Sequence, residues 1–345
     1  MKSARAFAIP YAFTLLSLVS VLAPVSGCRA DTPSAAAAKP AESDAVKKAR
    51  EQVRLHPKDI QAHLALGDAL FENGDYPGAK AALQIAVKVD PKSYQAHFNL
   101  ATIDYFINDY DGTITEGREA LRLDPNSADA HNIIGVALGE LGRYEEEIPE
   151  VRAAIRLDAN HAAAHHNLGM ALLRTGKLVE SLYELREAVR LSPKDPDYLA
   201  HLGLCLADNE KYDEAVKSYQ SSLAIAPKNS ENHNYLGVSL YKLGKLDAAI
   251  AEYLESVRLD PSNAVAYQNL GLAYSDQGAY DKAIPMLRKA AALPPDDPDT
   301  HLLLGTALIK TGKTDEGRAE WTKVLTMGNA DAKKKAQDLL DAHPQ

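Results

Sequence analysis

Cysteine is nearly absent from this sequence, whose 345 residues include only Cys28 and Cys205. Two thiols leave no room for a disulfide framework. Basic residues are also in the minority, with 38 Lys and Arg against 47 Asp and Glu and a formal net charge of -9. Proteins that bind phosphate backbones draw their affinity mainly from Lys and Arg. The composition therefore argues against nucleic acid as a partner and favours basic or neutral partners.

The N-terminus carries the pattern of a targeting segment. Lys2 and Arg5 are the only charges before a charge-free apolar run that ends in VLAPVSGC. This ending resembles that of bacterial lipoprotein signal sequences, although Val25 stands where leucine is commoner. The resemblance implies that residues 1–27 are a cleaved signal peptide and that Cys28 is acylated. It also implies a lipid-anchored protein of the bacterial cell envelope, facing the periplasm or the exterior. The alternative is an uncleaved anchor, because about 20 apolar residues can span a bilayer.

Short segments flank the central part of the chain. Residues 28–42 are rich in Ala, Pro and small polar residues without an amphipathic period, which predicts a flexible tether. Residues 43–59 are predicted to form an N-terminal capping helix, and residues 332–345 a C-terminal solvating helix and tail. Cys205 takes a position that other parts of the sequence fill with alanine or serine, so we expect an inert core thiol.

The central part of the sequence repeats itself every 34 residues. A typical period has Leu-Gly at its seventh and eighth positions, Gly at the fifteenth and Pro near its end. Apolar residues at positions 4, 7, 8 and 11, and again at 20, 24, 27 and 28, follow helical spacing and predict two amphipathic helices per period. The eight periods within residues 60–331 are 60–93, 94–127, 128–161, 162–195, 196–229, 230–263, 264–297 and 298–331.

These motifs resemble those of the tetratricopeptide repeat family. The resemblance implies an all-α fold, a right-handed superhelical solenoid of antiparallel helix pairs with flanking cap helices. A single repeat cannot bury its apolar stripe alone, so stacked neighbours are expected to share one core. The sequence has no phosphate-cradling glycine motif, no nucleophile elbow and no stretch left over for an enzyme domain. We therefore predict a non-catalytic protein–protein interaction scaffold without a cofactor or a bound metal.

A histidine recurs at the fourth position of six repeats. Leu199 and Tyr267 replace it in the other two, which favours a packing role with buried, neutral rings. Protonation would then cost folding free energy, so stability would fall as the pH drops toward and below ~6.5. The recurring histidines are His63, His97, His131, His165, His233 and His301.

A local cluster offers a competing interpretation of one of these histidines. Asp158, His161, His165 and His166 lie close together in DANHAAAHH, and two of the histidines are four residues apart. On a helix such a pair shares one face and could hold a metal ion. Since histidines in successive repeats are separated by at least one helix spacing of about 8–10 Å, they cannot share a zinc ion.

The candidate binding residues lie on the first helix of each repeat, at positions that in this family face the concave groove. An asparagine amide both donates and accepts, so it can pair with a peptide bond without reading its side chain. A similar asparagine ladder occurs in the sugar-transferase members of the family. The alternative is a solvated polar face. The predicted groove residues are Asn99, Asn132, Asn167, Asn234 and Asn269, with His166 and Tyr235 beside them and the aromatic anchors Phe71, Phe98, Tyr105 and Phe106.

The predicted groove positions on the first helices carry more acidic than basic residues. They lack the paired lysines and arginines that clamp C-terminal carboxylates in chaperone-type repeats. We predict an extended partner segment that is basic or neutral and carries apolar anchors, bound in pilus, outer-membrane or peptidoglycan machinery. The alternative function is a substrate-presenting or regulatory subunit of an envelope enzyme complex. The acids are Asp68, Glu72, Asp129, Glu140, Asp197, Asp208, Glu231, Asp276 and Asp299, and the bases are Arg174, Lys242 and Lys310.

Overall fold

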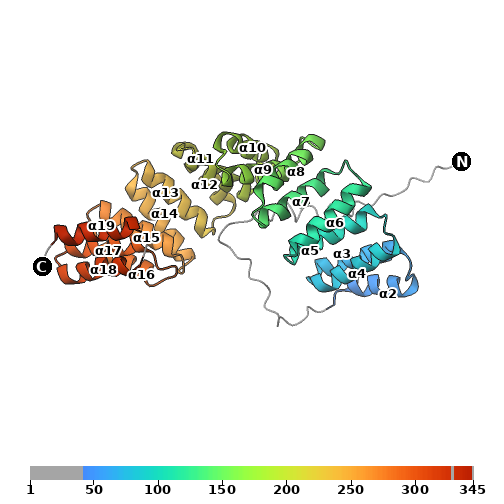
Figure 1. Cartoon of the computed structure of the whole chain (residues 1–345), viewed down its shortest axis with the longest axis horizontal. Coiled ribbons are helices and arrows are strands. Elements are labelled where there is room, and N and C mark those ends of the chain that lie inside the picture. The colour runs from blue at the N-terminus through green and yellow to red at the C-terminus, as the bar shows by residue number, and fades with distance from the viewer. Residues whose placement is uncertain (1–41, 328–329, 344–345) are drawn as a thin grey trace. The chain divides into compact units, whose positions relative to one another are not determined.

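The computed structural model describes residues 42–327 and 330–343, and every regular element within these ranges is an α-helix (Figure 1). The all-α class is therefore confirmed. The predicted signal peptide, Cys28 and nearly all of the predicted tether lie outside the described residues. The chain divides into two compact units, Met1–Pro193 and Lys194–Gln345, and each is described by itself.

The described part of the first unit, from residue 42 onward, contains one single helix followed by four helix pairs. Each pair consists of a helix that begins at the first position of a predicted repeat and a helix that begins at the seventeenth. Its helices are α2 (Asp44–Leu55), α3 (Ile60–Glu72), α4 (Tyr76–Val89), α5 (Tyr94–Phe106), α6 (Tyr110–Leu123), α7 (Ala128–Glu140), α8 (Tyr144–Leu157), α9 (Ala162–Arg174) and α10 (Leu178–Leu191).

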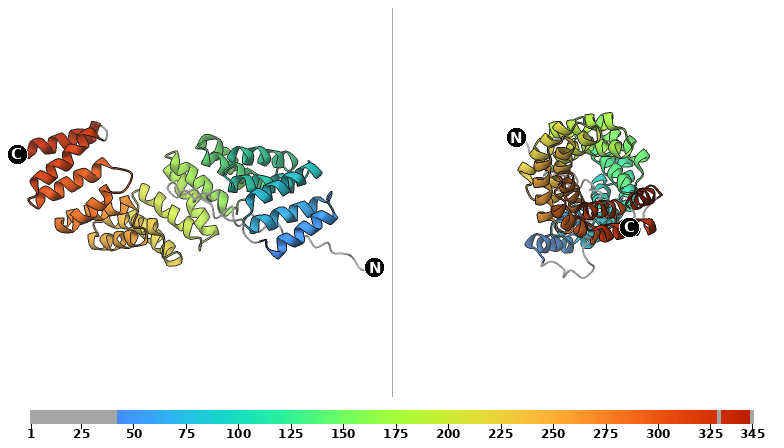
Figure 2. Two further views of the ribbon diagram at one scale, coloured as in Figure 1. Left: turned by 90° about the horizontal axis from the view of Figure 1, so that it is seen from below. Right: turned by 90° about the vertical axis from the view of Figure 1, so that its left-hand side faces the viewer.

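The described residues of the second unit form four further pairs followed by a single helix. The two helices of each pair pack against each other, and the pairs stack side by side within the unit (Figure 2). Its helices are α11 (Pro196–Asp208), α12 (Tyr212–Ile225), α13 (Ser230–Lys242), α14 (Leu246–Leu259), α15 (Ala264–Asp276), α16 (Tyr280–Ala291), α17 (Pro298–Lys310), α18 (Thr314–Thr326) and α19 (Ala330–Ala342).

Local sequence explains where the helices begin and where the chain turns. The side chains of Ser93, Ser127 and Asn229 each accept a hydrogen bond from a backbone N–H of the helix that follows. Between the two helices of a pair, six glycines have φ between +71° and +79°. Asn108 and Glu210 take this left-handed conformation, with φ of 61° and 59°, in the two repeats that lack the glycine.

Both terminal helices cover apolar surface of the neighbouring pair. At the N-terminal end, Val46 and Ala49 of α2 belong to the same buried cluster as Leu64 and Leu83. At the C-terminal end, Ala332, Ala336 and Leu340 of α19 are buried against a cluster that contains Trp321. The Arg318 guanidinium also donates to the Leu340 carbonyl at 2.9 Å. These helices act as caps, because a solenoid end without one would expose its core.

The interior of the first helices is tightly packed. A Cβ placed on Gly135 would lie 2.4 Å from Cγ2 of Val151, so only glycine permits this approach of α7 to α8. Cys205 is fully buried in α11, which agrees with the prediction of a core thiol. In the described part of the chain, no helix is both long enough and apolar enough to cross a membrane.

Candidate functional site

The first helices of successive repeats contact each other within each unit, α5 with α7 and α7 with α9 in the first, and α13 with α15 and α15 with α17 in the second. We call the surface formed by their charged groove positions the first-helix face. Every charged residue predicted for this face is exposed or half-buried, and none is buried. The first unit contributes Asp68, Glu72, Asp129, Glu140 and Arg174, and the second contributes Asp197, Asp208, Glu231, Asp276, Asp299, Lys242 and Lys310.

Four carboxyls of this face lie in surroundings that favour their neutral form. Burial, together with the nearby charge of Glu72, raises the pKa of Asp68 from 3.8 to about 7. Burial also raises the pKa values of Glu140, Asp197 and Asp208 above their ordinary values. Because burial penalises the charged carboxylate, a cation placed beside one of these groups would stabilise the charged form. The first-helix face therefore favours positively charged groups in both units.

The predicted asparagine ladder is present, but its amides pair with each other between neighbouring first helices. The Asn167 amide donates to Oδ1 of Asn132 at 3.0 Å, and the Asn269 amide donates to Oδ1 of Asn234 at 2.9 Å. Asn99 makes the corresponding bond to Asp68 at 3.2 Å and accepts one from Gln95 at 2.6 Å. Asn99, Asn132, Asn167 and Asn234 are 2–7% exposed, whereas Asn269 is half-buried.

The expectation that these asparagines lie open to a peptide is therefore wrong for the four buried ones. A side chain at position 6 lies against the preceding first helix, about 35 residues away in sequence, and spacing within one helix does not reveal that neighbour. His166, also predicted to face the groove, is 1% exposed, and its Nδ1 lies 3.3 Å from Oδ1 of Asn167. The asparagine pairs are hydrogen bonds that link the first helices of neighbouring repeats.

Three of the predicted aromatic anchors are likewise buried. Phe71, Phe98 and Tyr105 are 6%, 4% and 6% exposed. The rings of Phe71 and Phe106 pack edge to face with centroids 4.7 Å apart, which joins α3 to α5. Phe106 is half-buried, and Tyr235 is 37% exposed beside the ring of Tyr219. Only these two of the predicted aromatics retain surface for a partner.

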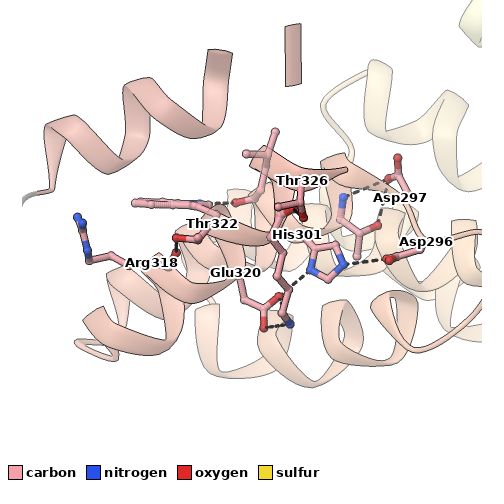
Figure 3. A network of polar contacts seen from close by, with 11 residues as sticks. Asp296, Asp297, His301, Arg318, Glu320, Thr322 and Thr326 are labelled. Atoms are coloured by element: carbon pink, nitrogen blue, oxygen red, sulfur yellow. Dashed lines mark hydrogen bonds and ion pairs between the residues drawn. The ribbon is translucent and has the colours of Figure 1, made fainter. Parts of the chain in front are cut away.

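The recurring histidines form a second regular feature, which joins the two helices of a repeat. In five repeats, Nδ1 of the histidine lies 2.6–2.7 Å from a carboxylate oxygen of a glutamate 19 residues later. Figure 3 shows the last of these pairs, in which His301 lies between Glu320 and Asp296. The five pairs are His97–Glu116, His131–Glu150, His165–Glu184, His233–Glu252 and His301–Glu320.

The glutamate is found only where the histidine is. The two repeats that have Leu199 and Tyr267 in place of histidine have Ser218 and Met286 at the glutamate position. The first repeat has His63 but Ala82 at the glutamate position, and the buried Nδ1 of His63 has no hydrogen-bond partner among the described residues. A buried polar atom without a partner costs free energy, so the glutamate completes the bonding of the ring.

At His165 this pairing corrects the prediction of a neutral ring. Nε2 of His165 lies 3.2 Å from the Ala159 carbonyl while Nδ1 lies 2.6 Å from Glu184, so both ring nitrogens face acceptors. A neutral ring donates from one nitrogen only, and the protonated ring satisfies both. The hydrogen bond that His165 donates to Glu184 raises the pKa of His165 above its ordinary value, despite the opposing effect of burial. The prediction of lower stability in mild acid is therefore wrong for His165.

Replacing Glu184 with glutamine is expected to lower the free energy of unfolding by about 1.5–3 kcal/mol at pH 5.5, the usual size of a hydrogen bond to a charged group. A raised folded-state pKa stabilises the protein fully below the unfolded value of ~6.5, and this stabilisation is lost as the pH rises through the folded-state pKa. The deficit of E184Q should therefore shrink between pH 5.5 and pH 8.5. Guanidinium unfolding at both pH values measures it, with E145Q, which neutralises an exposed acid, as the control. A deficit that grows with pH would contradict the pairing.

The histidines of the alternative metal cluster have separate hydrogen-bond partners in the structure. Nδ1 of His161 accepts from the backbone N–H of Ala164 and caps α9, and its Nε2 lies 3.1 Å from Asp129. His165 is bound to Glu184. Within residues 42–327 and 330–343, no three His, Cys, Asp or Glu side chains are grouped so as to hold a metal ion.

One polar residue of the first unit was missed by the sequence-based reasoning. Glu147, at the twentieth position of the third repeat, is 4% exposed between α7 and α8. The signal for it was a departure from the repeat pattern, because every other repeat has a small residue there. Those residues are Ala79, Thr113, Ser181, Ala215, Ala249, Ala283 and Gly317.

Comparison with known proteins identifies this architecture. Profiles of the tetratricopeptide repeat match residues 64–111, 105–162, 148–196, 167–230 and 274–325, and a TPR repeat profile matches residues 239–278. The chain belongs to the tetratricopeptide repeat family. Such repeats are generally non-catalytic interaction scaffolds, in agreement with the class of function predicted from the sequence.

Solved structures share the fold at low sequence identity. The crystal structure of the APC/C hetero-tetramer Cut9–Hcn1 matches with 19% identity and a TM-score of 0.60 over 76% of this chain. The chain spans about half of that protein, 52% of its length. The pilF protein of Pseudomonas aeruginosa matches with 23% identity and a TM-score of 0.54 over 68% of this chain and 98% of its own. No curated protein is similar enough to count as a match.

Proposed function

We propose that this tetratricopeptide repeat protein is a non-catalytic scaffold that binds an extended, basic or neutral segment of a partner protein on the first-helix face. The observation that carries the proposal is the acidity of that face in each unit, with four carboxyls against one basic side chain in the first and five against two in the second. Burial that raises the pKa values of Asp68, Glu140, Asp197 and Asp208 makes these carboxyls receptive to a cation. Phe106 and Tyr235 offer accessible aromatic surface for apolar anchors.

The proposed location is the bacterial cell envelope, with the chain attached through a lipid on Cys28. The proposal is supported by the basic N-terminal residues, the apolar run and the small residues before this cysteine. In that setting the scaffold would serve the assembly of pilus, outer-membrane or peptidoglycan machinery. Mass spectrometry of the chain purified from membranes tests the anchor, because an acylated N-terminal peptide beginning at Cys28 is expected and an unmodified Cys28 would refute it.

Binding of three labelled twelve-residue peptides tests the function directly. The peptides share alternating leucines and differ in carrying lysine, serine or glutamate at the other positions. The lysine peptide should bind roughly ten times more tightly than the glutamate peptide, with a difference that narrows as salt is added, because opposite charges attract and salt screens them. Fluorescence anisotropy measures the three dissociation constants. Preference for the glutamate peptide would reject the proposal.

A pair of variants in the second unit locates the binding face. Asp208 lies on the first-helix face, whereas Asp213 is an exposed acid on the second helix of the same repeat. D208N should weaken binding of the lysine peptide several-fold, and D213N, which removes the same charge, should leave it nearly unchanged. Equal effects of the two variants would place the partner elsewhere.

A further inference from the structure

Glu147 holds a carboxyl in a place where the rest of the repeat architecture has none. It lies in the first turns of α8 and is 4% exposed. Room for the carboxyl comes from Gly139 of α7, since a Cβ on that glycine would lie 2.6 Å from Oε2 of Glu147. The third repeat therefore departs from the pattern twice, with an acid on α8 and a glycine opposite it on α7, and the two departures fit each other.

One oxygen of this buried carboxyl has no partner. Oε2 of Glu147 makes no hydrogen bond within the described part of the chain. Buried carboxylates are normally paired or fully hydrogen-bonded, because an uncompensated buried charge is costly. Burial raises the pKa of Glu147 to about 8, so a proton neutralises this carboxyl at neutral pH.

Two charged side chains of the first-helix face, Glu140 and Arg174, act on the carboxyl of Glu147. Glu140, half-buried at the end of α7, adds a negative charge that raises the pKa of Glu147 further. Arg174, at the end of α9, lowers it, and its guanidinium lies 5.5 Å from the ring centroid of Tyr144. The Tyr105 hydroxyl donates to Oε1 of Glu140 at 3.4 Å. The attraction of Arg174 does not offset the burial and the second acid, so the site as a whole still favours an added positive charge.

We propose that Glu147 and Glu140 bind one ammonium group, that of a lysine side chain of the partner, and that Glu147 releases its proton as this group binds. An ammonium brings three N–H donors, which suits the unpartnered Oε2 and the carboxylate of Glu140. A divalent metal ion fits less well, because the described residues group no third carboxylate or imidazole there. In the step, the O–H bond of Glu147 breaks, its proton passes to the solvent, and the resulting carboxylate pairs with the ammonium. The inference rests on the proposed function and specifies that a lysine ammonium group is recognised at this part of the first-helix face.

Calorimetry with a defined probe tests the proton release. The probe is an acetylated and amidated form of the twelve-residue peptide of alternating lysine and leucine described above, titrated into the full-length chain at pH 7 in two buffers of different ionisation enthalpy. With a pKa of about 8, Glu147 is mostly protonated at pH 7, so binding should release up to about one proton per peptide. The same peptide with acetyl-lysine in place of lysine should release none.

Two variants separate this site from other titrating groups. Glu147→Gln mimics the neutral carboxyl, and Glu145→Gln removes an exposed acid from the same turn of α8. The affinity of the unsubstituted chain and of E145Q should increase with pH between 6 and 8, by up to about tenfold per unit. The affinity of E147Q should change much less over this range, and its proton release should be smaller by the contribution of Glu147.

The outcomes distinguish the two proposals. Failure of the lysine peptide to bind the unsubstituted chain would overturn the proposed function. Binding with the same proton release in the unsubstituted chain and in E147Q would leave the function standing and overturn the inference. Circular dichroism confirms that E147Q is folded. If it is not, the difference in proton release between the lysine and acetyl-lysine peptides on the unsubstituted chain decides the question.

Discussion

Glu147→Gln is expected to stabilise the protein at alkaline pH, by roughly 3–5 kcal/mol at pH 8.5. The pKa of Glu147 is raised from 4.5 to about 8 in the folded chain. Between these two pH values the carboxyl is protonated in the folded state and ionised in the unfolded state. Stability therefore falls as the pH rises through this window, and the cost is complete above the folded-state pKa. Glutamine has no such proton and avoids the cost. Near pH 5 the variant and the unsubstituted chain should be similar.

The difference in stability is measured by guanidinium unfolding at pH 5 and pH 8.5. Hydrogen exchange of the amides in α7 and α8 is the readout. Local exchange is needed because the repeats of a solenoid can unfold separately. Glu145→Gln serves as the control, since an exposed acid in the same turn should change stability by a few tenths of a kcal/mol at either pH. Destabilisation by Glu147→Gln at both pH values would show that the carboxyl is fully hydrogen-bonded. A residue that lowers stability yet departs from the repeat pattern is the kind of residue that a binding role explains.

Trp321→Ala is expected to lower the free energy of unfolding of the C-terminal repeat by about 3–5 kcal/mol, the usual cost of removing a buried tryptophan. The side chain is 1% exposed, and its Nε1 donates to the Leu302 carbonyl at 3.1 Å. It lies in the cluster that also holds Val324, Ala336 and Leu340. Its loss leaves a cavity between α17, α18 and α19. Because each repeat contacts only its neighbours, the cap helix should detach first.

Hydrogen exchange measures this local loss. Amides of α17, α18 and α19 should exchange much faster in W321A, whereas those of α3 to α9 should keep their protection. Trp321→Phe retains most of the packing and loses the hydrogen bond to Leu302, so it should cost less, about 1–2 kcal/mol. Unchanged protection of α19 in W321A would mean that the tryptophan does not hold the cap.

The helix pairs could be predicted from the sequence because their causes are local. A helix needs an apolar stripe at its own spacing, a cap such as Ser93 and a turn residue such as Gly142 with φ of 71°. Each of these signals lies within a few residues of the structure that it specifies. Even the turns without glycine, at Asn108 and Glu210, keep the same length and conformation.

The candidate site could be predicted only in part. The acidity of the first-helix face was readable, because charge is a property of composition and these side chains remain at the surface. The asparagines and histidines were assigned from their positions within a single helix, and their partners lie on other helices. Asn167 meets Asn132, and His165 meets Glu184. The first pairing occupies an amide that was expected to be available to a peptide. The second reverses the expected effect of acid on the contribution of His165 to stability.

The sequence by itself determined the family, the all-α fold, the helix pairs and the acidity of one face. Each 34-residue repeat contains the local signals that specify its own two helices. Only the tertiary structure decided which polar side chains are open and which are paired. Burial of a side chain depends on what packs over it, and a helix 19 or 35 residues away does that packing. Glu147 departs from the repeat pattern already in the sequence, but only the tertiary structure places its carboxyl against Gly139.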